Sequence, residues 1–162
     1  MQISFSDGTL LRVPSSLMRE SSRRLRALGF NRESGGLLVG VKVADEETYE
    51  LRRMSYPGRL DRRFPFAFLR SRISANRILQ RWWNDSGGRE NYLGEWHTHN
   101  VDTPIPSTID IDLMGQVAKD GSPSFGAFFM LIIGNSGTAY IEVLRQDGAE
   151  MKREGKVIPW SE

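Results

Sequence analysis

The two histidines of the chain stand close together, in the segment EWHTHN at residues 95–100. On a β-strand, residues two positions apart point to the same face, so His97 and His99 would present their imidazoles side by side. Two imidazoles on one face can bind a single divalent metal ion. The alternative is a pair of half-buried polar side chains on an edge strand. The sequence therefore offers two ligands of a candidate metal site.

The segment that follows offers a third ligand. Seven residues separate His99 from Ser107, and Asp110 comes three positions later. Ser107 stands where a helix N-cap belongs, and Ser-x-x-Asp is then a variant capping box that begins a helix. The same rigid first turn could hold Asp110 at a fixed distance from the strand end. Asp112 lies about 200° around that helix and cannot face the metal as well, whereas Asp102 is a rival ligand on a loop.

Three protein ligands leave the fourth position of a tetrahedral zinc ion open for water, which is typical of catalytic sites. A metal-dependent hydrolase also needs a carboxylate as general base beside that water. Glu33 is the leading candidate, because it precedes Gly35-Gly36 at an expected strand start, where glycines permit close backbone approach. Position alone, however, favours a solvated loop carboxylate. Glu95 is the competing base, two residues before His97 on the same strand face.

Periodic patterns of apolar residues predict the elements that would position these side chains. The expected strands cover residues 3–5, 9–13, 37–42, 48–54, 92–99, 125–133 and 138–144, with a last segment near 156–160. The expected helices cover residues 14–28, 66–83 and 107–119. The second helix has an apolar stripe made of Leu69, Ile73, Leu79 and Trp83. Turns are expected at 45–47 and 147–148, and a loop over 56–65.

About six or seven strands and three helices, without regular β-α-β alternation, indicate a mixed α/β or α+β fold. The 162 residues fit one domain, 1–162, which can bury a core without a disulfide. An eight-stranded α/β barrel needs about 250 residues and is excluded. The absence of cysteine excludes thiolate metal sites and fits a reducing compartment, so a cytoplasmic location is expected.

Charge is unevenly distributed along the chain. The first 90 residues carry 17 Lys and Arg against 10 Asp and Glu, and the last 72 carry 5 against 10. The arginines are scattered and lack the interleaved aromatic residues of a stacking platform, so nucleic-acid binding is not expected. The longest apolar run, residues 125–133, is about half the length of a membrane span, and no signal peptide is visible. A membrane partner is therefore not expected either.

The sequence resembles the JAMM (JAB/MPN) metalloprotease family at Glu33, His97-Thr98-His99, Ser107 and Asp110. The signature of that family is an upstream Glu, then His-x-His, seven residues, Ser, two residues and Asp. The segments ESGGLLVG at 33–40 and LGEWHTH at 93–99 look like its prokaryotic JAB branch. The resemblance spans roughly residues 10–145 and rests on a specific motif rather than on composition.

The resemblance implies a cytidine-deaminase-like α/β sandwich, a mixed central sheet flanked by helices, with Zn²⁺ at a strand end. The zinc ligands that it implies are His97, His99 and Asp110. Glu33 would take a proton from the metal-activated water and pass it to the leaving amine, and Ser107 would hydrogen-bond the oxyanion. Asn100 departs from the family, where a Pro commonly follows the second His. That departure implies altered loop stiffness rather than lost activity.

Members of the family mostly hydrolyse isopeptide or peptide bonds at the C-terminus of ubiquitin or ubiquitin-like proteins. Short bacterial members accompany ubiquitin-activating- and conjugating-like enzymes, including in anti-phage operons with cGAS-like nucleotidyltransferases. The resemblance thus implies a zinc-dependent (iso)peptidase acting on a ubiquitin-like protein or its conjugated target. The alternatives are a JAB peptidase that processes a sulfur-carrier protein or another metabolic peptide, a non-catalytic interaction module, and a RadC-like DNA-associated protein.

Overall fold

A computed structural model describes residues 1–44, 46–120, 125–147 and 150–160. Its strands are β1 (Gln2–Ser4), β2 (Leu10–Arg12), β3 (Gly35–Lys42), β4 (Thr48–Met54), β5 (Arg62–Phe64), β6 (Ala67–Leu69), β7 (Asn91–Thr98), β8 (Ala127–Ile133), β9 (Thr138–Asp147) and β10 (Glu150–Pro159). Its helices are α1 (Ser15–Leu28), α2 (Arg72–Asp85) and α3 (Thr108–Asp120). None of the helices in these ranges is long and apolar enough to cross a membrane. The predicted turns at 45–47 and 147–148 lie partly outside the described residues.

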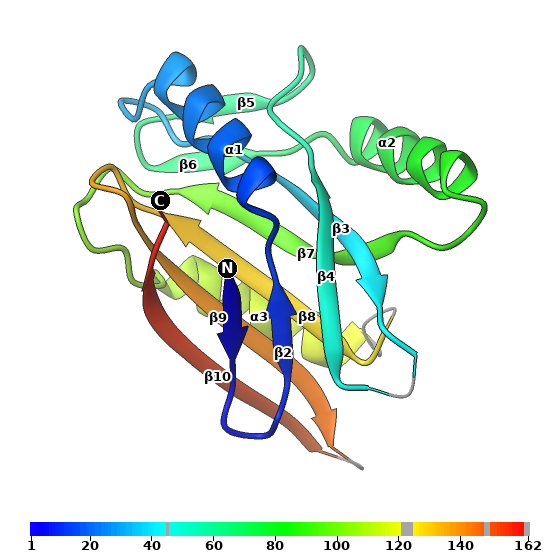
Figure 1. The fold of residues 1–162 in the computed structure, drawn as a ribbon. Helices are drawn as coiled ribbons and strands as arrows, with labels where there is room; N and C mark the ends of the chain where they lie inside the picture. Colours follow the sequence, from blue (N-terminus) through cyan, green and yellow to red (C-terminus); the bar gives the residue numbers. More distant parts are fainter. Residues whose placement is uncertain (45, 121–124, 148–149, 161–162) are drawn as a thin grey trace.

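Within the described residues, eight strands form one mixed sheet in the order β1-β2-β4-β3-β7-β8-β9-β10, and β5 and β6 form a separate hairpin (Figure 1). The pairs β2–β4 and β7–β8 are parallel, and the other neighbouring strands are antiparallel. Two parallel strands need a crossover connection between them. The crossover from β7 to β8 contains α3. The start of α3 therefore follows the carboxyl end of β7, where sheets of this kind form binding sites. The mixed sheet with three helices confirms the predicted fold class.

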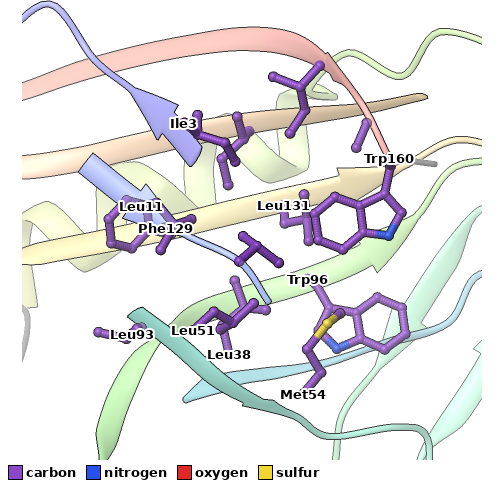
Figure 2. Packing of buried hydrophobic residues seen from close by; sticks show 14 of the residues in the cluster. Ile3, Leu11, Leu38, Leu51, Met54, Leu93, Trp96, Phe129, Leu131 and Trp160 are labelled. Atoms are coloured by element: carbon purple, nitrogen blue, oxygen red, sulfur yellow. The ribbon is translucent and has the colours of Figure 1, made fainter. Parts of the chain in front are cut away.

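The larger core cluster lies on the face of the sheet that α1 covers, and Figure 2 shows part of it. Leu25 of α1 belongs to the same buried cluster as Leu131 of β8 and Trp96 of β7. Trp96 is 1% exposed, and its indole Nε1 donates to the carbonyl oxygen of Ser55 at 2.9 Å. Because neighbouring residues of a strand point to opposite faces, burial of Trp96 turns the side chain of His97 to the other face.

Helices α2 and α3 cover that other face, and Figure 1 shows α3 behind the sheet while α1 lies in front. Met114 of α3 packs with Ile132 of β8, and Ala75 of α2 packs with Leu37 of β3. Residues paired across neighbouring strands share a face, and His97 pairs with Ile132. The histidine side chain therefore projects to the side of α2 and α3.

A bulge in β7 sets the direction of the residues before His97. The register between β3 and β7 shifts by one residue next to Gly94. Gly94 has a φ of 151°, and a Cβ there would lie 1.9 Å from the carbonyl oxygen of Phe129, so a glycine is required. Tyr92 and Glu95 are three positions apart, yet the tyrosine hydroxyl donates to the carboxylate at 2.8 Å. The bulge thus re-aims side chains beside the site, as bulges often do.

The predicted helix over 66–83 is wrong at its start. Residues 67–69 form β6, and α2 begins at Arg72 behind the N-cap Ser71, whose hydroxyl accepts from the Ser74 N–H at 3.3 Å. The loop predicted over 56–65 also contains β5. Strands of three residues are too short for a period of two to be recognised. For the same reason ten strands are present in the described residues rather than six or seven.

The predicted apolar stripe of α2 is also wrong. Ile73 and Trp83 are 61% and 43% exposed, and Leu69 precedes the helix. Ala75 is the buried residue of the helix. The residues that pack beside it are Ile78, Leu79 and Trp82. The small side chain of Ala75 brings the helix close to the sheet, and a stripe drawn through bulky residues alone misses that contact.

Replacing Gly94 by Ala is expected to destabilise the fold, because the added Cβ would collide with the backbone of Phe129. We expect the free energy of unfolding, measured in urea, to fall by about 3 kcal/mol, which is the destabilisation typical of an overpacked core position. The control is Gly115→Ala in α3, where a Cβ meets nothing within 4 Å and Ala favours a helix by about 0.5–1 kcal/mol. Equal stability of the two variants would contradict the requirement for glycine at position 94 of the bulge.

Candidate active site

His97 and His99 lie at the carboxyl end of β7. His97 pairs with Gly35 of β3 and with Ile132 of β8, and the His99 N–H donates to the carbonyl oxygen of Ile133 at 3.1 Å. The ring centroids of the two imidazoles are 5.0 Å apart, with 55° between the ring planes. The two imidazoles therefore share a face at the strand end, as the spacing predicts.

Asp110 lies in the first turn of α3 and faces both imidazoles. Its Oδ1 is 3.0 Å from Nε2 of His97, and its Oδ2 is 3.5 Å from Nε2 of His99. Ser107 donates to Oδ2 twice, from its hydroxyl at 2.6 Å and from its backbone N–H at 2.7 Å. The Asp110 N–H in turn donates to the Ser107 hydroxyl oxygen at 3.3 Å. The capping box and the contact with the histidines are thus present together.

The two other aspartates considered as ligands lie elsewhere. Asp112 is exposed, as its position around the helix predicts, and Asp102 is exposed on the loop after β7. The backbone carbonyl of Asp102 accepts a hydrogen bond from Ser136 at 2.7 Å, so this loop is held against the β8–β9 turn. Only Asp110 joins the two histidines in a group of side chains that could hold a metal ion, among the described residues.

The ligand atoms of this group lie close enough together that they could hold a metal ion. One ligand atom from each of His97, His99 and Asp110 lies within 4.8 Å of the others. The Nε2 atom of His97 is buried and makes no hydrogen bond of acceptable geometry, although Oδ1 of Asp110 is 3.0 Å away. A buried polar nitrogen without a partner is costly unless something binds it. Two imidazole nitrogens and one carboxylate oxygen are the donor set of a catalytic zinc ion with an open position, so the residues fit the metal.

The surroundings of Asp110 change its pKa. Burial by itself would raise the pKa of Asp110, but the close imidazoles of His97 and His99 and the hydrogen bonds from Ser107 hold that pKa well below its ordinary value. The contact with the Asp110 carboxylate raises the pKa of His99, against the opposing effect of burial. Asp110 is therefore ionised at neutral pH and presents a negative charge to the cavity.

Glu33 lies two residues before β3, near the carboxyl end of β7. Its N–H donates to the carbonyl oxygen of Phe64 at 2.7 Å, and its side chain lines the same cavity as His97. Burial raises the pKa of Glu33; the charges of His99 and His97 oppose this rise and that of Asp110 adds to it. A carboxylate with a raised pKa is suited to accept a proton near neutral pH.

Gly35, two residues after Glu33, permits the close approach that the sequence predicts. A Cβ at Gly35 would lie 2.5 Å from the ring of Phe68 and 2.8 Å from the carbonyl oxygen of Trp96. A side chain at this position would therefore push β6 away from β3 and β7. The glycine keeps the hairpin against the strand that follows Glu33.

Glu95, the competing base, is held in an ion pair. Its Oε1 accepts from Nη2 of Arg70 at 2.5 Å and from the Tyr92 hydroxyl at 2.8 Å. These two donors hold the Glu95 carboxylate against Arg70 and Tyr92. Arg70 was not recognised from the sequence, because 25 residues separate it from Glu95 and no local pattern marks it.

These residues line one cavity of about 520 Å³. Its polar part contains Glu33, Glu95, His97, His99, Ser107 and Asp110. Its apolar part comes from β6, the loop after β7 and the start of α3, and includes Phe66, Phe68, Leu69, Val101 and Ile109. Phe66 is 89% exposed and Ile109 is 70% exposed. The cavity therefore combines polar groups that could do chemistry with apolar lining, which suits a peptide with apolar side chains.

Comparison with known proteins gives the class to which this arrangement belongs. Residues 14–147 match the family model for prokaryotic homologs of the JAB domain (Prok-JAB). Since that match covers most of the chain, the protein belongs to this family, and the resemblance seen in the sequence is confirmed.

Two curated relatives and one solved structure illustrate the similarity. The chain is 29% identical over 143 residues to the CD-NTase/cGAS isopeptidase of Pseudomonas aeruginosa (strain BWHPSA011 / Pa011), covering 86% of each protein. It is 32% identical over 124 residues to the CD-NTase/cGAS isopeptidase of Escherichia coli (strain TW11681), covering 75% of this chain and 74% of the relative. The solution structure of protein DSY2949 from Desulfitobacterium hafniense has the same fold, with a TM-score of 0.56 over 89% of each chain at 21% identity.

Replacing Asp110 by Asn is expected to weaken Zn²⁺ binding by more than about 100-fold, because the amide loses the charge that balances the cation. The measurement is isothermal titration of metal-free protein with Zn²⁺. The matched control is Asp112→Asn, an exposed carboxylate two positions along the same helix, which should bind Zn²⁺ like the parent protein. Equal affinity of the two variants would remove Asp110 from the ligand set.

Proposed function

We propose that this protein is a zinc-dependent isopeptidase or peptidase that hydrolyses the bond at the C-terminus of a ubiquitin-like protein or of its conjugate. The observation that carries the proposal is the convergence of five side chains in one cavity. They are Glu33, His97, His99, Ser107 and Asp110. Zn²⁺ bound by His97, His99 and Asp110 would supply a Lewis acid that polarises the scissile carbonyl and activates water.

Glu33 is the general base in this proposal. Its carboxylate takes a proton from the attacking water as the new C–O bond forms, and delivers that proton to the amine nitrogen as the C–N bond breaks. Burial raises the pKa of Glu33 above its ordinary value, which makes this carboxylate a stronger proton acceptor. Glu95 is committed to Arg70 and Tyr92, which supports Glu33 rather than Glu95 in this role.

Ser107 is the oxyanion donor in this proposal. Its hydroxyl donates to Oδ2 of Asp110, but its own backbone N–H donates to that oxygen too. The carboxylate therefore keeps one hydrogen bond from Ser107 when the hydroxyl turns to a substrate. A donor held on the first turn of a helix is preorganised for the developing negative charge.

The substrate tail is proposed to lie extended along the cavity, against β6. This strand lines the cavity and pairs on one side with β5, so its other edge could add a strand from the substrate. The loop after β7 also lines the cavity, through Asn100 and Val101. Of the loop predicted over 56–65, only Pro65 contributes to the lining.

The names of the relatives suggest the biological setting. Both curated relatives are CD-NTase/cGAS isopeptidases, so we propose that this chain, as one domain, acts in a bacterial anti-phage conjugation system. Its partners there would be a ubiquitin-like protein or conjugated target, ubiquitin-activating- and conjugating-like enzymes, and a cGAS-like nucleotidyltransferase. A cytoplasmic location is part of this proposal.

Cleavage of reporter fusions tests the function. The reporter follows the C-terminus of a ubiquitin-like protein, of a cGAS-like nucleotidyltransferase, or of a sulfur-carrier protein from the same genome. We expect the zinc-loaded protein to cleave one of the first two fusions, a chelator to stop it, and Glu33→Gln to lower kcat by about 10²–10⁴ with zinc retained. Cleavage of the sulfur-carrier fusion alone would favour the metabolic alternative, and undiminished turnover by Glu33→Gln would move the base elsewhere.

Substitution of Ser107 separates its two roles. Ser107→Ala should lower kcat by about 10²–10³ through loss of the oxyanion donor and the free energy of unfolding by about 1 kcal/mol through loss of the cap. Ser107→Thr keeps a hydroxyl and is the matched control, which should retain both properties in large part. A loss of stability without a loss of rate would leave Ser107 with the structural role alone.

A further inference from the structure

One guanidinium group holds the chain segment that leads to Glu33. Nη2 of Arg63, on β5, donates to the backbone carbonyl oxygens of Leu28 at 3.1 Å, Gly29 at 3.1 Å and Arg32 at 2.9 Å. Nε of the same side chain donates to the carbonyl oxygen of Glu33 at 3.2 Å. A single side chain thus contacts the end of α1 and the residue that precedes β3 by two positions.

The backbone on both sides of the Glu33 side chain is fixed. The Glu33 N–H donates to the carbonyl oxygen of Phe64, and its carbonyl oxygen accepts from Arg63. The next residue, Ser34, donates from its N–H to the Thr98 hydroxyl at 2.9 Å and accepts from the Thr98 N–H at 2.8 Å. β5 therefore holds one side of this segment and β7, which carries His97, holds the other.

The hairpin that carries Arg63 also lines the cavity. Phe66, Phe68 and Leu69 are among the lining residues, and the Phe68 ring lies against Gly35. In Figure 1 the β5–β6 hairpin lies at the end of the molecule where β7 ends. The hairpin thus contacts the Glu33 segment through β5 and the cavity through β6.

We propose that Arg63 is a positioning residue that fixes the backbone of Glu33. Through Arg63, the position of the Glu33 carboxylate is linked to the position of the β5–β6 hairpin. The proposal rests on the function proposed above, in which Glu33 is the base and the substrate lies against β6. A guanidinium with several donors suits the task, because it bridges carbonyl groups in a fixed geometry that an ammonium group cannot reproduce. A base displaced by about 1 Å can lose about 10²-fold in rate.

Arg63→Gln tests the proposal, with Arg62→Gln as matched control. Arg62 is the exposed neighbour on the same strand. We expect Arg63→Gln to lower kcat about 10- to 100-fold with KM within about threefold of the parent and zinc content unchanged, because the substitution replaces neither a proposed ligand nor a residue that lines the cavity. Arg62→Gln should behave as the parent. If Arg63→Gln fails to fold, Arg63→Lys gives the same test, because lysine cannot bridge the same carbonyl groups.

A double variant distinguishes positioning from a general structural effect. In the Glu33→Gln background the base is already absent, so Arg63→Gln should lower the residual kcat no further than about threefold. A loss as large as in the parent background would overturn the proposal. So would a loss carried by KM, or by zinc content, rather than by kcat.

Hydrogen exchange provides a readout that does not need a substrate. Amide exchange over residues 30–34 should be at least about tenfold faster in Arg63→Gln than in Arg62→Gln, while exchange in β8 stays the same. If the parent protein cleaves no fusion, the proposed function fails. The exchange comparison still tests whether Arg63 holds the Glu33 segment in place. Unchanged exchange at residues 30–34 would contradict it.

Discussion

The site depends on one carboxylate that serves two structures at once. Asp110 closes the first turn of α3 through its bonds with Ser107 and faces the imidazoles of His97 and His99. A carboxylate that is only 7% exposed is costly to bury, and the cost is offset only when its oxygens have partners. The helix start and the strand end are therefore fixed relative to each other by the same group that could bind the metal.

The strand order explains why the remaining site residues lie nearby. β7 and β8 are parallel, so the crossover from β7 starts at the carboxyl end of β7 and brings Ser107 and Asp110 to it. β3 runs antiparallel to β7, so β3 begins where β7 ends. Glu33, just before β3, is therefore at the same edge of the sheet as the histidines. The proposed metal ligands and the proposed base come from three separate segments, and sheet topology places them together.

Local patterns in the sequence predicted part of this arrangement. The spacing of His97 and His99 was enough to place both on one face, and Ser107 was recognised as a cap because capping depends on adjacent residues. Glu33 required the family resemblance, since only the pairing of β3 with β7 brings it to the histidines. Arg63 and Arg70 could not be recognised, because their partners depend on the hairpin that was predicted as part loop and part helix. The predicted start of α2 was wrong because β5 and β6 have three residues each, and strands that short have no detectable period.

Diffraction from crystals of the zinc-loaded protein at the zinc absorption edge tests the central claim most directly. The account predicts one anomalous peak, bonded to Nε2 of His97, Nε2 of His99 and a carboxylate oxygen of Asp110 at about 2.0–2.2 Å, with the remaining coordination position facing the Glu33 side chain. A peak bonded to other residues, or none at this site in protein that contains stoichiometric zinc, would contradict the account.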